Sequence, residues 1–375
     1  MRGVYVLLLI SLLGYTGRVS GQESVTITQC YEWARANYPQ IHQMGLIDQT
    51  ERYSLSNVGK AWLPQLSVSG KASYQSDVTK LPLDGDKISS LLPGFEIPSL
   101  SKDQYQVVAQ VDQTIWDGGS TRSARALTRA EAIANREQLE SELYALNDRV
   151  NQIYFGCLLQ DELIRQNALL QKELQVNIER IEAMMENGVA NQSDLESMEV
   201  ELLNARQNEI ELKASRTVYR QMLATFINKP LTDQVVLKTP ESPERSLSTQ
   251  INRPELRALD AKSEWIETQN KQVTAGLMPR IGAFVQGGYG RPGLNMLEDS
   301  FEPYYVAGVR LSWNLGKLYT LKNDRRKIEV SRRQIDVQRE TFLFNTRLQL
   351  LQQNTEIKKM TDLMRADDDI IRLRT

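Results

Sequence analysis

The sequence predicts a duplicated, mainly helical fold in which each copy contributes two β-strands. Three observations support this prediction: the order of elements repeats, two pairs of segments alternate in polarity, and apolar steps of three and four residues persist over very long segments. Asn37-Tyr38-Pro39 returns as Asn252-Arg253-Pro254, and Leu63-Pro64 returns as Met278-Pro279 at the same offset. A repeat of this kind constrains the whole fold. We therefore expect two copies of helix, strand, loop, strand and long helix, over 22–230 and 252–375, joined by a linker over 231–251.

The composition argues against several classes of function. Lys plus Arg total 45 against 47 Asp plus Glu, so no net charge favours nucleic acid as a partner. The mean hydropathy of −0.42 is too polar for a bundle of membrane-spanning helices. The chain has one histidine, His42, and two widely separated cysteines, Cys30 and Cys157. It therefore lacks metal-ligand spacing, a disulfide framework and a nucleophile motif. An exported enzyme is the alternative that this composition disfavours, and no cofactor is expected.

The N-terminus has the features of an export signal. Arg2 precedes the apolar run 4–13, and Val19-Ser20-Gly21 follows it as a small-residue cleavage site. The run is too short for a membrane-spanning helix, so an uncleaved N-terminal anchor is the weaker alternative. We expect 1–21 to be a signal peptide and the mature chain to begin near Gln22, outside the cytoplasm.

Helical patterning over 28–63 gives way to segments with a period of two. Pro39 lies inside the helical segment and predicts a break between a short helix and a longer one. Alternating polarity then predicts strands over 65–75, 103–115, 280–290 and 303–315. The apolar residues expected on one face of these strands are Leu66, Val68, Tyr74, Val107, Val111, Ile115, Ile281, Val285, Tyr289, Val309, Leu311 and Trp313.

Alternation of this kind fits either a half-buried strand of a soluble sheet or a lipid-facing strand of a membrane barrel. Export, and flanking helices too long to cover four strands as a compact layer, favour the membrane. Trp313 is then expected at a membrane interface, where aromatic girdles form, and a position in a soluble core is the alternative. Four strands cannot close, and an open edge in lipid leaves unpaired backbone groups that each cost several kcal/mol. Identical chains must therefore complete the ring.

Very long helices follow each pair of strands. Apolar residues step by three and four along 118–187, which is typical of coiled-coil packing. Gly188 interrupts this helix as a residue able to take positive φ. Ser193, with Glu196 three residues later, is the candidate N-cap of a returning helix over 193–228. In the second copy a long helix is expected over 317–375.

In their order, spacing and duplication, these segments resemble the outer-membrane efflux protein family, the TolC-like channels of Gram-negative envelopes. The resemblance covers nearly all of the mature chain and rests on Asn-Tyr-Pro-Gln-Ile at 37–41, Leu63-Pro64, Ile-Trp-Asp-Gly-Gly at 115–119, the hairpin at 188–195 and the proline-containing linker. It implies a homotrimer in which each protomer gives four strands to a twelve-stranded barrel surrounded by outer-membrane lipid. Helices continue the barrel as a tunnel (a periplasmic α-barrel). It also implies a passive exit duct for efflux or type I secretion, coupled to a periplasmic adaptor protein and an inner-membrane transporter.

The resemblance places the periplasmic entrance and the adaptor-docking surface at the hairpin, with Gly188, Val189, Asp194 and Leu195 as candidates. Asp194 matches a family aspartate in the network that closes the entrance, and helix capping is its alternative role. The second copy departs from the family pattern, because the counterpart of Gly188 would fall beyond Thr375. We therefore expect the second repeat to be truncated. A truncated channel without function and a secreted structural coiled coil without a pore are the alternatives.

Overall fold

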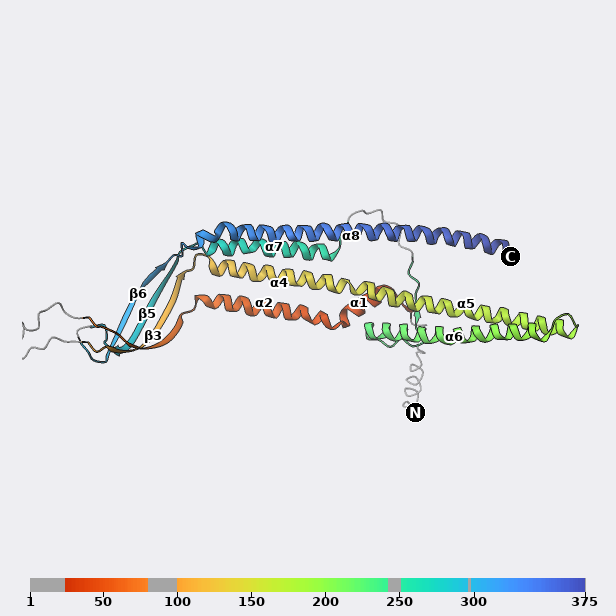
Figure 1. Cartoon of the computed structure of the whole chain (residues 1–375), viewed down its shortest axis with the longest axis horizontal. Coiled ribbons are helices and arrows are strands. Elements are labelled where there is room, and N and C mark those ends of the chain that lie inside the picture. The colour runs from red at the N-terminus through yellow and green to blue at the C-terminus, as the bar shows by residue number, and fades with distance from the viewer. Residues whose placement is uncertain (1–23, 80–99, 242–250, 296–297, 375) are drawn as a thin grey trace, which may run out of the picture. The chain divides into compact units, whose positions relative to one another are not determined.

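A computed structural model describes residues 24–79, 100–241, 251–295 and 298–374 (Figure 1). Its contacts divide the chain into two compact units. Unit 1 consists of Met1–Met44 and Leu139–Pro254, and unit 2 of Gly45–Gln138 and Glu255–Thr375. The units are groups of residues in contact, whereas the two copies are defined by sequence similarity. The expected signal peptide, 1–21, lies outside the described residues.

Unit 1 is built on a helical hairpin. Helix α5 (Leu146–Glu186) leads to a tight turn, and α6 (Gln192–Ile227) returns alongside it (Figure 1). Helix α1 (Ile27–Asn37) packs on both. A capping box fixes the start of α1, because the side chains of Thr26 and Gln29 each accept a hydrogen bond from the other's backbone N–H. The largest fully buried side chains of the core come from these three helices: Val150, Tyr154, Cys157, Leu223, Ile227 and Cys30.

The two cysteines, far apart in the sequence, lie in this one core. Cys30 belongs to α1 and Cys157 to α5, and both are fully buried. Burial raises the pKa of each thiol to about 11. Both thiols therefore stay protonated at neutral pH and behave as small apolar side chains.

Unit 1 also contains a small sheet that the sequence did not predict. Strand β1 (Ser24–Val25) pairs in parallel with β4 (Val236–Leu237), which lies inside the segment expected to be a linker. The hydroxyl of Tyr154 lies 2.9 Å from the Val25 carbonyl oxygen and 2.7 Å from that of Lys238, within donating distance of both. A strand of two residues cannot show alternation, so the sequence carries no signal for this pairing.

Pro39 breaks the first helical segment, as predicted. Helix α1 ends at Asn37, a 3-10 turn η1 (Pro39–His42) follows, and α2 (Gln43–Gly59) begins after it. Tyr38, before the proline, has φ −68° and ψ 126°. This is the extended conformation that proline favours in the residue preceding it. A second 3-10 turn, η2 (Lys60–Trp62), leads into the sheet.

The helix predicted without interruption over 118–187 is divided at Ala145. Helix α4 (Ser120–Tyr144) ends one residue before this alanine, and α5 begins one residue after it. Ala145 has φ −63° and ψ −17°, and this ψ departs from the helical value of about −42°. The division is therefore a local change in backbone hydrogen bonding. Neither glycine nor proline marks it in the sequence.

Unit 2 contains long helices joined by apolar contacts and ion pairs. Helix α7 (Pro254–Ala275) packs against α8 (Lys317–Arg374) through the buried residues Ile266, Ile328 and Ile335. The helices α2 and α4 are linked by ion pairs from Arg136 to two carboxylates of α2, those of Asp48 and Glu51. Among the described residues, no helix has both the length and the apolar character needed to cross a membrane.

Four strands of unit 2 form one antiparallel sheet in the order β2-β3-β5-β6. Each copy contributes a hairpin, and the two hairpins pair with each other through β3 and β5 (Figure 1). Long helices with four antiparallel strands are the fold class that the sequence predicts. The strands are β2 (Gln65–Tyr74), β3 (Asp103–Trp116), β5 (Arg280–Arg291) and β6 (Glu302–Ser312).

Candidate functional site

The four-stranded sheet has one face covered by apolar side chains, here called the apolar face. The register pairs Val111 of β3 with Leu66 of β2 on one side and with Val285 of β5 on the other, so these side chains lie on the same face. Several of them are well exposed in the single chain, and Val309 is 70% exposed. The structure thus brings together on this face most of the predicted strand residues: Leu66, Val68, Tyr74, Val107, Val111, Ile281, Val285, Tyr289, Val309 and Leu311.

Ile115 and Trp313 are the two predicted strand residues that do not fit this arrangement. A β-bulge shifts the register at the end of β3, so that Trp116, rather than Ile115, pairs with Ile281. A bulge adds an unpaired residue to one strand, and nothing in the alternation reveals its position. Trp313 was predicted to lie within the strand over 303–315, but β6 ends one residue before it, at Ser312. The indole Nε1 of Trp313 donates to the Leu277 carbonyl oxygen at 2.9 Å.

Aromatic side chains flank the apolar face at both ends. Trp116 and Trp313 lie where the strands meet the helices. The strands contain 10, 14, 12 and 11 residues, and roughly 9–11 residues tilted by about 45° cross the hydrocarbon layer of a membrane. Aromatic rows at both ends of such strands are typical of membrane interfaces. At the end of the sheet next to the loops, each strand carries one tyrosine on the apolar face. These are Tyr74, Tyr105, Tyr289 and Tyr305.

The opposite face of the sheet, here called the polar face, has a different chemistry. Two aromatic side chains pack against glycines of the neighbouring strand: Tyr304 against Gly288, and Phe284 against Gly308. A Cβ at Gly288 would overlap the tyrosine ring. The Gln106 side-chain amide also donates to the Tyr304 hydroxyl. The remaining residues of this face are mostly polar or charged and include Ser67, Ser69, Lys71, Gln104, Gln110, Asp112, Gln286, Arg310 and Ser312.

The sheet has two open edges. Within the described residues, β2 pairs only with β3, and β6 pairs only with β5. Both edge strands are at least 10 residues long and are apolar on one face. Long edges of this kind present unpaired N–H and C=O groups to other chains. The sheet is therefore suited to pairing with further copies along both edges.

The junction between β3 and α4 is fixed by a buried carboxylate. Asp117 is 8% exposed and accepts hydrogen bonds from the N–H groups of Gly119 at 2.9 Å and Thr121 at 2.6 Å. Burial raises the pKa of Asp117, but the hydrogen bonds from Thr121 and Gly119 outweigh this effect and lower the pKa below its usual 3.8. Gly118 has φ 66°, and a Cβ there would overlap Met278. Asp117 is therefore a charged cap of α4.

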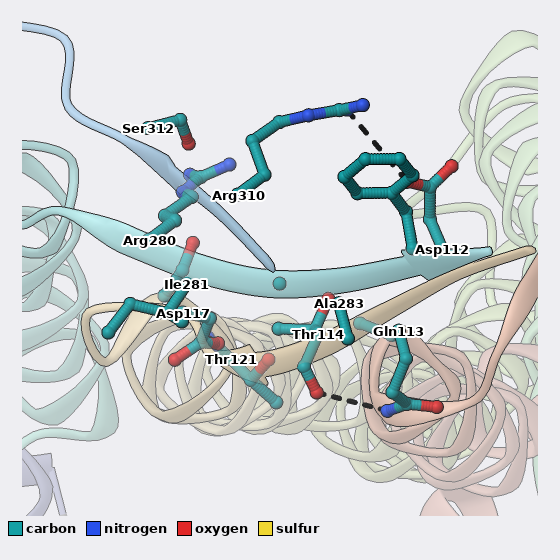
Figure 2. Close-up of a pocket in the computed structure, with 14 residues that line it drawn as sticks. Asp112, Gln113, Thr114, Asp117, Thr121, Arg280, Ile281, Ala283, Arg310 and Ser312 are labelled. Carbon is teal, nitrogen blue, oxygen red and sulfur yellow. Dashed lines mark hydrogen bonds and ion pairs between the residues drawn. The ribbon is translucent and has the colours of Figure 1, made fainter. Parts of the chain in front are cut away.

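A cavity of about 300 Å³ lies at this junction (Figure 2). Figure 2 shows the side chains of Arg280 and Arg310 on the same side of β5, with Asp112 of β3 nearby. The guanidinium of Arg310 lies 3.9 Å from Asp112 and 4.8 Å from the centroid of the Phe284 ring. Sequence reasoning missed this cluster because its members lie on three strands that only the register brings together.

The turn between α5 and α6 contains the residues predicted at the channel entrance. Gly188 has φ 72°, which confirms the prediction of a positive φ. The N–H groups of Gly188 and Val189 donate to the carbonyl oxygens of Met185 and Met184, both at 2.9 Å, and so cap the end of α5. Val189 is 76% exposed, whereas Leu195 is half-buried.

The N-cap of α6 is Asn191 and not Ser193, so the sequence prediction was wrong at this position. The side chain of Asn191 accepts from the Asp194 N–H, and the Asp194 carboxylate accepts from the Asn191 N–H, both at 3.1 Å. This reciprocal pair satisfies two backbone donors before Ser193 is reached. The local role of Asp194 is therefore capping, the alternative that the sequence left open.

Comparison with known proteins gives a family match. Residues 30–229, more than half of the chain, match the family model described as Outer membrane efflux protein. A search of curated proteins found no significant match.

Solved structures share the fold at low sequence identity. The structure of CusC, described in terms of folding and transmembrane channel formation, has a TM-score of 0.56 and 13% identity, covering 85% of this chain and 72% of CusC. The Campylobacter jejuni CmeC outer membrane channel has a TM-score of 0.56 and 12% identity, covering 85% and 68%. The Vibrio cholerae outer membrane protein VceC has a TM-score of 0.54 and 14% identity, covering 85% and 75%. Because the family model spans more than half of the sequence and these structures share the fold, the chain belongs to the outer membrane efflux protein family, as an outer-membrane channel that extends into the periplasm and not an enzyme.

Proposed function

We propose that this channel is a passive exit duct completed by three copies of the chain. We further propose that it receives its substrates through a periplasmic adaptor protein and an inner-membrane transporter. The observation that carries the proposal is the four-stranded sheet with two different faces and two open edges. Barrels made from a single chain begin at eight strands, so four strands need partners. Cyclic symmetry would place β2 of one copy beside β6 of the next, and three copies would supply twelve strands.

The two faces of the sheet support an orientation. The apolar face would contact lipid, and the polar face would line the duct, as in barrels whose strands alternate apolar-out and polar-in. The exposure of the apolar face in a single chain favours lipid as its partner, since Leu66 is 71% exposed and Leu311 66% exposed. Transport energy would come from the inner-membrane transporter, and the duct itself would carry out no chemistry.

An arginine placed on each face tests this orientation. Val309 lies on the apolar face, and Val306, on the same strand, lies on the polar face. We expect Val309→Arg to remove most of the heat-modifiable oligomer from the outer-membrane fraction, because arginine near the middle of the lipid face costs about 2–4 kcal/mol. Val306→Arg is the matched control and is expected to assemble normally. Equal assembly of both variants, or a soluble elongated wild-type protein, would refute the proposal.

The turn between α5 and α6 is proposed as the periplasmic entrance, where Gly188, Val189, Asp194 and Leu195 would meet the adaptor protein. In this proposal the carboxylate of Asp194 helps to hold the entrance closed. We expect Asp194→Ala to raise single-channel conductance in planar bilayers, because a group that restrains the closed entrance is lost.

A second variant separates closure from helix capping. Asn191→Ala removes the same capping box but leaves the Asp194 carboxylate in place. A rise in conductance with Asp194→Ala alone supports the proposed closure. An equal rise in both variants assigns the effect to fraying of α6, and unchanged conductance in Asp194→Ala contradicts the proposed role.

A further inference from the structure

We propose that Gly288 sets the width of the duct, because it lets the aromatic ring of Tyr304 lie along the wall instead of projecting into the lumen. Gly288 lies on β5 and pairs directly with Tyr304 of β6 on the polar face. The proposal rests on the proposed function, because it takes the polar face to be the wall of the duct. It adds the residue that would decide how large a solute the sheet lets pass.

The hydroxyl of Tyr304 shows the course of its side chain. It accepts a hydrogen bond from the side-chain amide of Gln106, which belongs to β3, and β5 lies between β3 and β6. Because neighbouring strands are about 4.8 Å apart, the two partners start from backbones roughly 10 Å apart. A side chain that stood away from the sheet could not make this contact. The Tyr304 side chain therefore crosses β5 along the surface of the sheet.

Gly288 is the residue that leaves room for this crossing. A Cβ at this position would lie 2.5 Å from the Tyr304 hydroxyl oxygen and 2.7 Å from the ring carbon Cε1, well inside the usual contact distance of about 3.5–4.0 Å. Any other residue would therefore displace the ring. Side chains occupy a few staggered rotamers, and those of a strand otherwise stand roughly perpendicular to the sheet. A displaced Tyr304 ring would thus turn away from the wall and into the lumen.

A second glycine on the same face has the same arrangement in the opposite direction. Gly308 of β6 pairs directly with Phe284 of β5, and a Cβ there would lie 3.2 Å from Cε1 of the ring and 3.3 Å from Cζ. A small shift of the ring would relieve these contacts, whereas the overlap at Gly288 requires the ring to move away. The arrangement therefore occurs twice on the polar face, and Gly288 is the position where a side chain would disturb it most.

The exposure of the two faces indicates that side chains on the polar face lie close to the sheet. Along 104–110 and 302–308, every second residue lies on the polar face and is half-buried, whereas the residues between them, on the apolar face, are exposed. Side chains on the polar face therefore cover one another. The space above this face, which would be the lumen, is correspondingly wider.

The number of strands makes the position of the ring important. Twelve strands about 4.8 Å apart and tilted by about 40° enclose a backbone cylinder roughly 24 Å across. Cyclic symmetry would place Tyr304 of all three copies at the same level. Three rings turned inward at one level would form a constriction, which a glycine at position 288 avoids.

A cysteine reporter deeper in the duct measures this width. Ser312→Cys lies on the polar face at the helix end of β6, whereas Tyr304 lies toward the loop end of the same strand. In the proposed duct, a reagent added to intact cells must pass the level of Tyr304 to reach this thiol. The probes are polyethylene glycol maleimides of increasing mass, all too large to cross the outer membrane by other routes, and a shift on denaturing gels reports labelling. The native Cys30 and Cys157 are fully buried and should not react.

We expect Gly288→Ala in the reporter chain to abolish labelling by the largest maleimide that labels the reporter chain without it, while smaller maleimides still react. Gly287→Ala is the matched control, since this neighbouring glycine lies on the apolar face and a Cβ there meets nothing within 4 Å. Adding Tyr304→Ser to Gly288→Ala removes the displaced ring and should restore labelling. Tyr304→Ser alone should leave the size limit unchanged, because the native ring already lies out of the lumen.

The outcomes separate the role of Gly288 from the proposed function. Unchanged labelling of Gly288→Ala would refute the role and leave the duct intact. A larger size limit in Tyr304→Ser alone would also refute it, since the native ring would then project into the lumen, and this result counts even if Gly288→Ala does not assemble as a heat-modifiable oligomer. If no reagent labels Ser312→Cys in intact cells but all label it after lysis, the proposed duct is overturned, and the role of Gly288 with it.

Discussion

Asp117 caps α4 with a buried charge, and the contribution of this residue to stability depends on pH. Its pKa is lower in the folded protein than its usual 3.8, so the stabilisation is fully present above that value and is lost as the pH falls through the folded pKa. We expect Asp117→Ala to lower the free energy of unfolding by about 1 kcal/mol at neutral pH. The difference in the free energy of unfolding between wild type and Asp117→Ala should become smaller in strong acid. Urea denaturation at neutral and acid pH measures it.

Asp117→Asn is the control for the charge. The asparagine side chain can still accept one hydrogen bond from the start of α4 but does not titrate in acid. Its stability relative to Asp117→Ala should therefore vary little with pH. If Asp117→Ala is less stable than wild type by the same free energy at neutral and at acid pH, the carboxylate charge contributes nothing to stability.

Single residues differ in how far the sequence predicts them. The positive φ of Gly188 could be predicted, because that backbone conformation strongly favours one residue type. The N-cap of α6 could not, because both Asn191 and Ser193 are good capping residues and the course of the turn decides between them. Trp116 was missed for a similar reason, since the bulge at Ile115 changes which side chain reaches the apolar face.

Helix α6 holds the segment after it through a buried arginine. Arg220 is 5% exposed and donates to the carbonyl oxygens of Thr232 and Val235 at 2.6 and 2.8 Å. Arg220→Met would leave both acceptors without this donor, and each buried unsatisfied group costs about 1–3 kcal/mol. We expect global destabilisation by about 3 kcal/mol and faster amide hydrogen exchange over 230–238, measured by mass spectrometry.

Arg216 provides a matched control one helical turn earlier. It pairs with Asp161, which is 39% exposed, and with Asp233, which is 84% exposed, and ion pairs open to solvent contribute only about 0–1 kcal/mol each. Arg216→Met should therefore lower the free energy of unfolding much less than Arg220→Met does. Equal effects of the two substitutions would mean that charge near the linker, rather than buried hydrogen bonding, holds this segment.

The elements that could be predicted are those with many repeats of one period. The long helices show steps of three and four residues over many turns, and β2, β3, β5 and β6 alternate over 10 or more residues. The pairing of β1 with β4 involves two residues on each side and depends on tertiary contacts with Tyr154. The division at Ala145 is a change in ψ that no residue type in the sequence requires.

At the scale of the whole molecule, the duplication predicted two β-hairpins, but it did not predict that they pair with each other in one sheet. The sheet order shows that the copies meet through β3 and β5, which leaves β2 and β6 as the edges. The cavity with Arg280 and Arg310 exists only because this pairing aligns β3, β5 and β6. Its residues lie in both copies, so no local motif could have indicated it.

The open edges lead to a prediction about assembly. Ser69 lies on edge strand β2 and Val306 on edge strand β6, both on the polar face. We expect a chain carrying Ser69→Cys and Val306→Cys, treated with a flexible bismaleimide, to give covalent products of one, two and three chains and nothing larger. The native Cys30 and Cys157 should not react, since both are fully buried and burial raises the pKa of each thiol to about 11.

Chains with only one of the two substitutions are the controls. In a closed ring β2 meets β6 of the next copy and never another β2, so neither single variant should cross-link. Cross-linking of Ser69→Cys alone would indicate a two-fold dimer with like edges paired. Products longer than three chains would indicate an open polymer or a larger ring, and either result would contradict a twelve-stranded barrel of three copies.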